Sequence, residues 1–134
     1  MNTTYFLNQV AGNLFKTKTT PALPSAFYIG LSSTAPNIDG TNVGEPNSSA
    51  GYARVELTSL GEPDNGVVTN ELAINFNEST ASWGTITHFV IYDAETGGNL
   101  LMYGALSTPR SVEAATIMTI KENYLSLSAQ NPTA

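Results

Sequence analysis

The first apolar pattern of the chain has the period of a helix. Between Thr4 and Phe15 the apolar residues recur every three or four positions, which places them on one helical face. The hydroxyl of Thr3 or Thr4 can cap the free amides of the first turn, and Pro21 and Pro24 close the region. We therefore predict one amphipathic helix that docks on the rest of the protein or on a neighbouring subunit. Its apolar residues are Phe6, Leu7, Val10, Ala11, Leu14 and Phe15.

Beyond Pro24 the period changes to two, which is the period of strands. The strongest segment, Thr85 to Tyr92, is almost wholly apolar and is expected to be a central strand covered on both faces. A Gly97-Gly98 turn separates it from the run Asn99 to Leu106, so the two runs predict an antiparallel hairpin. Further strands are predicted at residues 26–31, 52–58, 71–77, 115–120 and 124–128.

Two of these strands alternate between apolar and polar residues, so each is expected to bury one face. The sequence Asp64-Asn65-Gly66 lies between them and predicts a tight turn, because Asn and Gly tolerate positive φ. The inward residues are expected to be Ala53, Val55 and Leu57 in the first strand, opposite an exposed or interfacial set of Tyr52, Arg54, Glu56 and Thr58, and Leu72, Ile74 and Phe76 in the second.

The connection from Ser32 to Gly51 is rich in Pro, Gly, Asn and Ser and is longer than is usual for an unstructured loop in a compact domain. We expect it to be functional or to be ordered by a neighbour. The last residues, 131–134, are expected to form a frayed tail.

About seven short strands with turn signals between them predict a mainly β fold. The expected architecture is an antiparallel β-sandwich, jelly-roll-like or Ig-like, with one short N-terminal amphipathic helix. The chain has 134 residues, which fits one core. We divide it into residues 1–20, an amphipathic helix and linker, and residues 21–134, a single β-sandwich domain.

The number and sign of the charged residues limit the kinds of binding partner that we expect. Charged residues make up 12% of the chain, against roughly 25% in an average protein, which suits a surface that is packed in an assembly. The net charge is −6 and the few basic residues are not clustered, so neither nucleic acid nor an anionic membrane is an expected partner. The start lacks the basic region of a signal peptide and no apolar run approaches a membrane span, so the protein is expected to remain in the cytoplasm where it is made.

His88 is the only histidine, and the chain has no cysteine. To act as a general base, His88 would need a nucleophile and an orienting carboxylate, which the sequence does not indicate. Its position on an apolar strand, in phase with Ile86, Val90 and Tyr92, favours a hydrogen-bonded core or interface histidine.

Other polar groups also have simpler interpretations than a reactive site. The stretch Asn37 to Asn42, with Glu45 behind it, offers oxygen ligands for Ca²⁺ but lacks the spacing of a calcium loop. Asp93 and Glu95 flank a turn and are interpreted as backbone caps. We therefore predict no catalytic residue, no metal site and no cofactor. Six aromatic residues could form a sugar-binding platform, although core or interface packing is favoured: Tyr28, Tyr52, Trp83, Tyr92, Tyr103 and Tyr124.

Several motifs resemble a group of small bacteriophage structural proteins, which are labelled tail-fibre-like or minor structural proteins. They are Gly51 to Arg54, Trp83 to Asp93, Gly97 to Leu101 and Tyr103 to Leu106. The resemblance covers nearly the whole chain. It implies a location in the virion and a non-enzymatic role, commonly as a trimer, and it carries no catalytic residues.

Two functions in the virion remain open at this point. The first is a capsid decoration or head-associated protein that acts by self-assembly and docking on the particle. The alternative is a tail-fibre or receptor-binding module whose 32–51 loop and exposed tyrosines contact host surface glycans. A small hydrolase or lectin-like enzyme is disfavoured because no nucleophile motif is present. The expected partners are the protein itself, as a homotrimer, and other virion proteins such as major capsid, neck or tail proteins.

Overall fold

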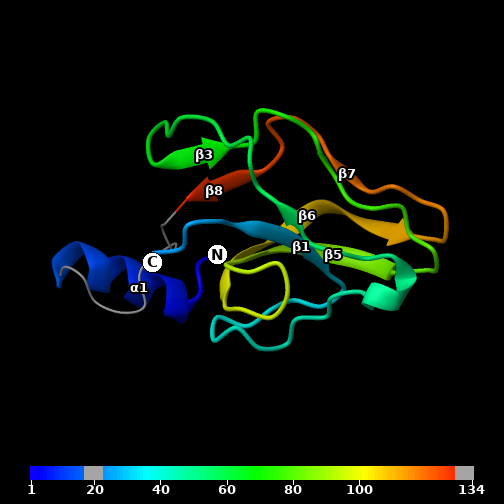
Figure 1. The fold of residues 1–134 in the computed structure, drawn as a ribbon, viewed down its shortest axis with the longest axis horizontal. Coiled ribbons are helices and arrows are strands. Elements are labelled where there is room, and N and C mark those ends of the chain that lie inside the picture. The colour runs from blue at the N-terminus through cyan, green and yellow to red at the C-terminus, as the bar shows by residue number, and fades with distance from the viewer. Residues whose placement is uncertain (17–22, 129–134) are drawn as a thin grey trace.

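The computed structural model describes residues 1–16 and 23–128, and all structural statements below concern these residues. They form a helix at the N-terminus followed by short antiparallel strands (Figure 1). The elements are α1 (Thr4–Phe15), β1 (Tyr28–Ser32), the 3-10 helix η1 (Ser48–Ala50), β2 (Val55–Glu56), β3 (Val67–Thr69), β4 (Ile74–Asn75), β5 (Gly84–Tyr92), β6 (Leu100–Val112), β7 (Thr119–Ile120) and β8 (Ser126–Ser128).

The largest sheet has the strand order β2-β1-β5-β6, with antiparallel neighbours throughout. Its centre is β5, where Ile91 pairs with Ile29 on one side and with Met102 on the other. This arrangement confirms the predicted central strand and hairpin. β6 extends beyond the predicted Leu106 as far as Val112, because its distal half pairs with the first residues of β5.

The second layer consists of two ribbons, β3-β8 and β4-β7, rather than one continuous sheet. Apolar side chains of both layers form one buried cluster, and each fully buried one stabilises the fold by roughly 1.5–3 kcal/mol before ordering costs. The main sheet contributes Leu31, Ile86, Ile91 and Leu101, and residues in and around the ribbons contribute Ile74, Phe76, Met118, Leu125 and Leu127. The prediction of a mainly β, antiparallel fold with one N-terminal helix is confirmed.

A register shift between Ile86 and His88 divides β5 into two phases. Ile86 and Ile91 lie in the main core despite being five residues apart, whereas Val90 belongs to a second cluster with Tyr92 and Leu100. His88 is therefore out of phase with Ile86, and the prediction that the two share a face is wrong. Between the pairs Ile86–Arg110 and His88–Ala105, two steps along β5 face five along β6, and sequence alternation cannot reveal such an irregularity.

The helix begins where predicted, with Thr3 as its N-cap, whose side chain accepts a hydrogen bond from the amide of Phe6. Phe6 is buried, and α1 packs on β6. The other end projects away from the β layers (Figure 1), and Leu14 and Phe15 are 66% and 79% exposed. Docking is thus confirmed for the first turns, while the apolar face is uncovered at its distal end.

Residues ahead of the helix extend the main sheet at the outer edge of β6. Thr3 donates from its amide to Leu101 O (2.9 Å) and from its hydroxyl to Leu100 O (2.6 Å), and Tyr103 N donates to Met1 O (2.9 Å). Asn2 and Thr3 are 1% and 0% exposed. The sequence pattern did not indicate this anchored segment, because a three-residue run is too short to show a period.

Several predicted strands are shorter than expected. Within 52–58, 71–77 and 115–120 the structure has only two-residue strands, and Leu72, predicted to point inward, is 61% exposed. Tyr52, predicted on the outer face, is buried. The predicted Asn65-Gly66 turn is confirmed, with positive φ at both residues and a bridge between Asp64 and Val67. The frayed tail predicted at 131–134 and the linker at 17–20 lie outside the described residues.

Candidate functional site

The long loop after β1 folds against the outer face of the main sheet. Its two arms are joined by the amide of Ser33, which donates to Gly44 O, and by the amide of Gly44, which donates to Ser32 Oγ, both at 3.0 Å. Val43 packs against the second cluster of β5 and β6. Contacts within the chain therefore order the loop, which the sequence had left as either a functional loop or one ordered by a neighbour.

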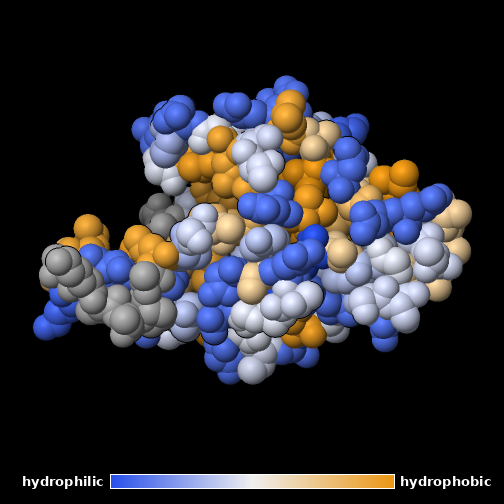
Figure 2. Space-filling view, viewed as in Figure 1, coloured by the Kyte–Doolittle hydropathy of each residue, from blue (hydrophilic) through white to orange (hydrophobic). Residues whose placement is uncertain are grey.

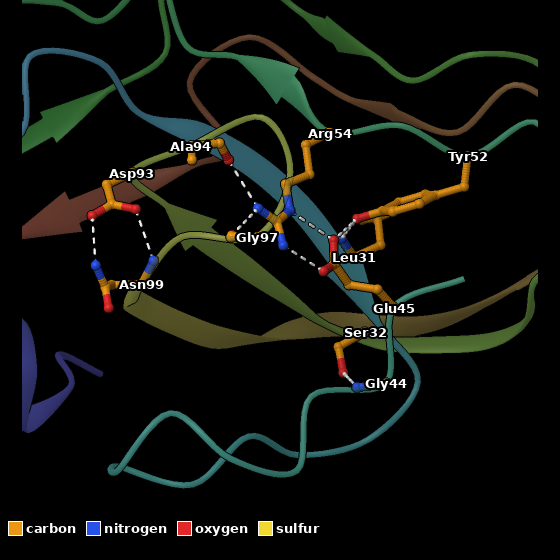
Figure 3. A network of polar contacts seen from close by, with 10 residues as sticks. All are labelled: Leu31, Ser32, Gly44, Glu45, Tyr52, Arg54, Asp93, Ala94, Gly97 and Asn99. Carbon is orange, nitrogen blue, oxygen red and sulfur yellow. Dashed lines mark hydrogen bonds and ion pairs between the residues drawn. The ribbon is translucent and has the colours of Figure 1, made fainter. Parts of the chain in front are cut away.

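An ion pair fixes the end of this loop to two other segments (Figure 3). Arg54 donates to both carboxylate oxygens of Glu45, at 2.9 Å from Nε and 2.7 Å from Nη2. The remaining nitrogen, Nη1, donates to the carbonyl oxygens of Ala94 and Gly97, each at 2.8 Å. We call Glu45, Tyr52, Arg54 and these two carbonyl groups the Arg54 clamp.

The clamp is largely removed from water. The side chains of Arg54 and Glu45 are 7% and 21% exposed, and the guanidinium lies 3.5 Å from the centroid of the Tyr92 ring. Bidentate, charge-assisted hydrogen bonds and a cation–π contact offset the cost of burying the two charges. The hydrogen bonds of the guanidinium thus hold the Glu45 side chain and two backbone carbonyl groups together.

Tyr52 connects the clamp to the core. Its hydroxyl donates to Glu45 and accepts from the amide of Leu31 (3.0 Å), and its ring meets Trp83 edge to face at 5.4 Å. Burial and the neighbouring carboxylate raise the pKa of Tyr52 far above its ordinary value of 10.0. A Cβ atom at Gly30 would collide with the Tyr52 hydroxyl and approach Glu45 to 2.9 Å, so β1 requires glycine there.

The clamp joins the loop, the segment before β2 and the β5–β6 hairpin tip. Its role is to hold these three segments in position. The alternating pattern predicts an outer-face position for Arg54 and therefore does not predict the clamp. A hint was available, because Arg54 is one of only five basic residues and lies in an alternating segment close behind Glu45.

The other candidates are separate from the clamp and from one another. His88 is partly buried, and its Nδ1 lies 2.8 Å from the hydroxyl of Thr87, which confirms a hydrogen-bonded histidine. Asp93 accepts from the amide of Asn99 (2.8 Å) and so caps the turn as predicted. Asp39 accepts from the amide and hydroxyl of Thr41, and these bonds lower the pKa of its carboxyl.

The predicted oxygen-rich stretch does not gather around one point. Glu45 turns toward Arg54, while Asp39 caps its own exposed turn. In residues 1–16 and 23–128, no group of three or more His, Cys, Asp or Glu side chains is placed to hold a metal ion. In the same two ranges, no helix is long and apolar enough to cross a bilayer.

The aromatic residues divide between core and surface. Tyr52, Trp83 and Tyr92 are 6–8% exposed and pack inside, as the favoured interpretation predicted. Tyr124, in contrast, is 74% exposed and lies apart from them in the segment between β7 and β8. The six aromatics therefore do not make one platform.

A comparison with known protein families gives the fold and the clamp their context. Residues 2–128 match the family described as podophage GP4 fiber I protein gp80. The chain belongs to this family. The match includes α1, both β layers and the Arg54 clamp, and it confirms the resemblance to tail-fibre-like phage proteins. Membership in the fiber I family identifies the protein as a structural component of a bacteriophage virion. No curated protein matches the sequence.

Proposed function

We propose that this protein is a non-enzymatic module of a phage tail fibre. The observation that carries the proposal is the family match over residues 2–128, whose description names a fibre protein. Of the two virion positions expected from the sequence, it favours the fibre over the capsid surface. The antiparallel β fold and the 12% of charged residues are compatible with a packed fibre.

The module is proposed to assemble with copies of itself through the projecting end of α1. Leu14 and Phe15 are exposed there, and hydrophobic atoms lie at the surface where α1 leaves the body (Figure 2). Within Thr4–Phe15 the helix contains no charged residue, and the nearest cation is its C-cap Lys16. If a neighbouring copy covered this end of α1, apolar surface would be removed from water. A trimer remains the number that the family resemblance implies.

The 32–51 loop and the exposed Tyr124 are proposed to face the host and contact surface glycans. Binding residues are commonly carried by loops that a firm scaffold positions, and the Arg54 clamp provides that firmness here. Catalysis is not part of the proposal. His88, the one histidine, is engaged by the adjacent Thr87 hydroxyl and sits on a strand in the middle of the main sheet.

Gold-labelled antibodies against the purified protein, applied to intact particles, test the position in the virion. We expect the label on fibres extending from the tail. Label distributed over the capsid surface would contradict the proposal and would favour head decoration.

Light scattering across a dilution series tests self-association. The wild-type protein should keep the mass of an oligomer at micromolar concentration, and a Leu14→Gln/Phe15→Gln variant should shift toward the monomer. As a control, Leu72→Gln alters an exposed leucine away from α1 and should leave the mass unchanged. A wild-type monomer throughout the series would refute assembly through α1.

A further inference from the structure

A groove lies between the distal half of β6 and the segment that runs from β7 to β8. Its volume is about 140 Å³, below the roughly 300 Å³ at which drug-sized pockets begin, so it fits one small ring rather than an extended ligand. Phe89, Met118 and Leu125 contribute apolar surface to it, and Arg110, Lys121 and Tyr124 contribute long side chains that are exposed. We call it the Tyr124 groove.

The charge of the Tyr124 groove is opposite to that of the protein. Arg110 and Lys121 both line it, and no Asp or Glu does, in a chain with 11 acidic and 5 basic residues. Neither cation forms an ion pair with any residue in 1–16 or 23–128, whereas Arg54 is neutralised by Glu45. Two cations without a carboxylate partner, held at one groove, favour an anionic ligand.

The two aromatic residues of the groove differ in how closely they are packed. The Phe89 ring lies over Gly104, where a Cβ atom would come within 2.7 Å of its Cε1, so glycine is needed for this ring position. Tyr124 N donates to Lys121 O (3.1 Å) in a turn where Asn123 has a φ of 65°. This turn holds the Lys121 ammonium 5.9 Å from the centroid of the Tyr124 ring, which is 74% exposed.

A sugar ring has an apolar C–H face and a rim of hydroxyl groups, so it suits a site with an aromatic ring beside Ser and Thr hydroxyls. Ser107, Thr108 and Thr119 also line the Tyr124 groove. Aromatic surface for the ring, hydroxyls for its rim and two cations for an acidic substituent are therefore gathered in one place. Two cations are too few for the multiple phosphate contacts by which nucleic acid is bound.

We propose that the Tyr124 groove binds a single acidic sugar of a host-surface polysaccharide. The carboxylate or phosphate of that sugar pairs with Arg110 and Lys121, and its ring packs on Tyr124. The proposal rests on the proposed fibre function and makes it more specific, because it names the ligand class and places the site on β6 and the β7–β8 segment.

Titration calorimetry with the full chain tests the ligand class. The probes are oligogalacturonate and its uncharged methyl ester, and glucose 6-phosphate and glucose. We expect at least one charged probe to bind ten or more times tighter than its neutral counterpart, with affinity falling as salt is added. The pair that shows this difference tells whether the acidic group is a carboxylate or a phosphate. Equal affinity within both pairs, or equally tight binding of poly-glutamate, would overturn the proposal.

Three variants locate the binding. Arg110→Gln/Lys121→Gln should lower the affinity for the charged saccharide at least tenfold and leave that for the neutral one unchanged, while Tyr124→Ala should weaken both. Lys16→Gln is the matched control, because it removes an exposed cation at the end of α1. An equal loss in Lys16→Gln would mean that only the net charge matters and would overturn the site.

Failure of this inference and failure of the proposed function give different results. Antibody label on the fibres together with no preference for charged saccharides would refute the groove and leave the fibre role intact. Label on the capsid together with a preference that depends on Arg110 and Lys121 would refute the fibre role and support the groove.

Discussion

Arg54 makes four hydrogen bonds, and Glu45 supplies the only negative charge among their acceptors. Glu45→Gln would keep the shape of the side chain but remove the charge that compensates a guanidinium of 7% exposure. We expect the free energy of unfolding to fall by about 2 kcal/mol, since hydrogen bonds between charged groups each contribute roughly 1.5–3 kcal/mol. Urea denaturation followed by the fluorescence of Trp83 would measure the change.

Glu56→Gln provides the control for that variant. Glu56 is an exposed residue of β2 and makes no ion pair within the described ranges, so its substitution should change stability by no more than about 0.5 kcal/mol. Equal losses in the two variants would show that the Arg54 clamp adds nothing beyond net charge.

The Tyr52 hydroxyl makes stability depend on alkaline pH. In the unfolded chain Tyr52 ionises at its ordinary pKa of about 10, whereas in the folded protein it stays neutral well above that. Below pH 10 neither state is ionised and this group has no effect. Above pH 10 the unfolded state loses the proton first, so stability should fall by up to about 1.4 kcal/mol per pH unit.

Denaturation curves measured between pH 8 and pH 11 would test this dependence. Tyr52→Phe should lower stability at neutral pH by about 1 kcal/mol, because two hydrogen bonds are lost, and should flatten the alkaline decline. Tyr124→Phe, which alters an exposed tyrosine, should keep the wild-type curve. An unchanged slope in Tyr52→Phe would contradict the assignment.

At the scale of elements, β5 is the strand on which the sheet depends. Ile91 is 0% exposed and pairs with Ile29 and Met102 in the two flanking strands. Ile91→Asp should cost about 4 kcal/mol or more, because a carboxyl group would be buried without a partner. The same substitution at Ile117, which is 58% exposed, should cost less than about 0.5 kcal/mol. Thermal denaturation of both variants decides the point, and a folded Ile91→Asp protein of wild-type stability would show that the core is misplaced.

The two ends of α1 should respond differently to the same truncation. Phe6→Ala removes a buried ring that packs with the core and should destabilise the protein by about 3–5 kcal/mol. Phe15→Ala removes a ring that is 79% exposed and should have almost no effect on the stability of the monomer. Circular dichroism melts at low concentration would compare them, and similar losses would mean that the distal end of α1 is also packed within the monomer.

The elements that could be predicted from the sequence are those defined by neighbouring residues. The bounds of α1 follow from one amphipathic stretch and its cap, and the β5–β6 hairpin follows from two apolar runs around a glycine turn. The short ribbons could not be predicted in the same way. β3 pairs with β8, although 57 residues of sequence separate Thr69 from its partner Ser126. A strand of two or three residues is also too short to show a period.

At the scale of the whole molecule, the candidate sites escaped prediction because they join distant parts of the chain. Arg54 contacts carbonyl groups 40 and 43 residues away, and Asn2 donates to Ser128 O across 126 residues. The Tyr124 groove likewise combines Phe89, Arg110 and Tyr124 from three separate segments. Alternation in the sequence indicates which residues are buried together, but it does not indicate which charges meet.

The Arg54 clamp also has a consequence for the order in which the chain folds. Its carbonyl acceptors lie in the β5–β6 hairpin tip, so the bonds from Arg54 can close only after β5 and β6 have formed and β1 and β2 have joined them. Contacts that close after the rate-limiting step hold the native state without speeding its formation. In stopped-flow experiments, Glu45→Gln should therefore accelerate unfolding and leave the refolding rate nearly unchanged, with a φ-value of about 0.2 or less. The clamp would then lengthen the lifetime of the folded state without speeding its formation.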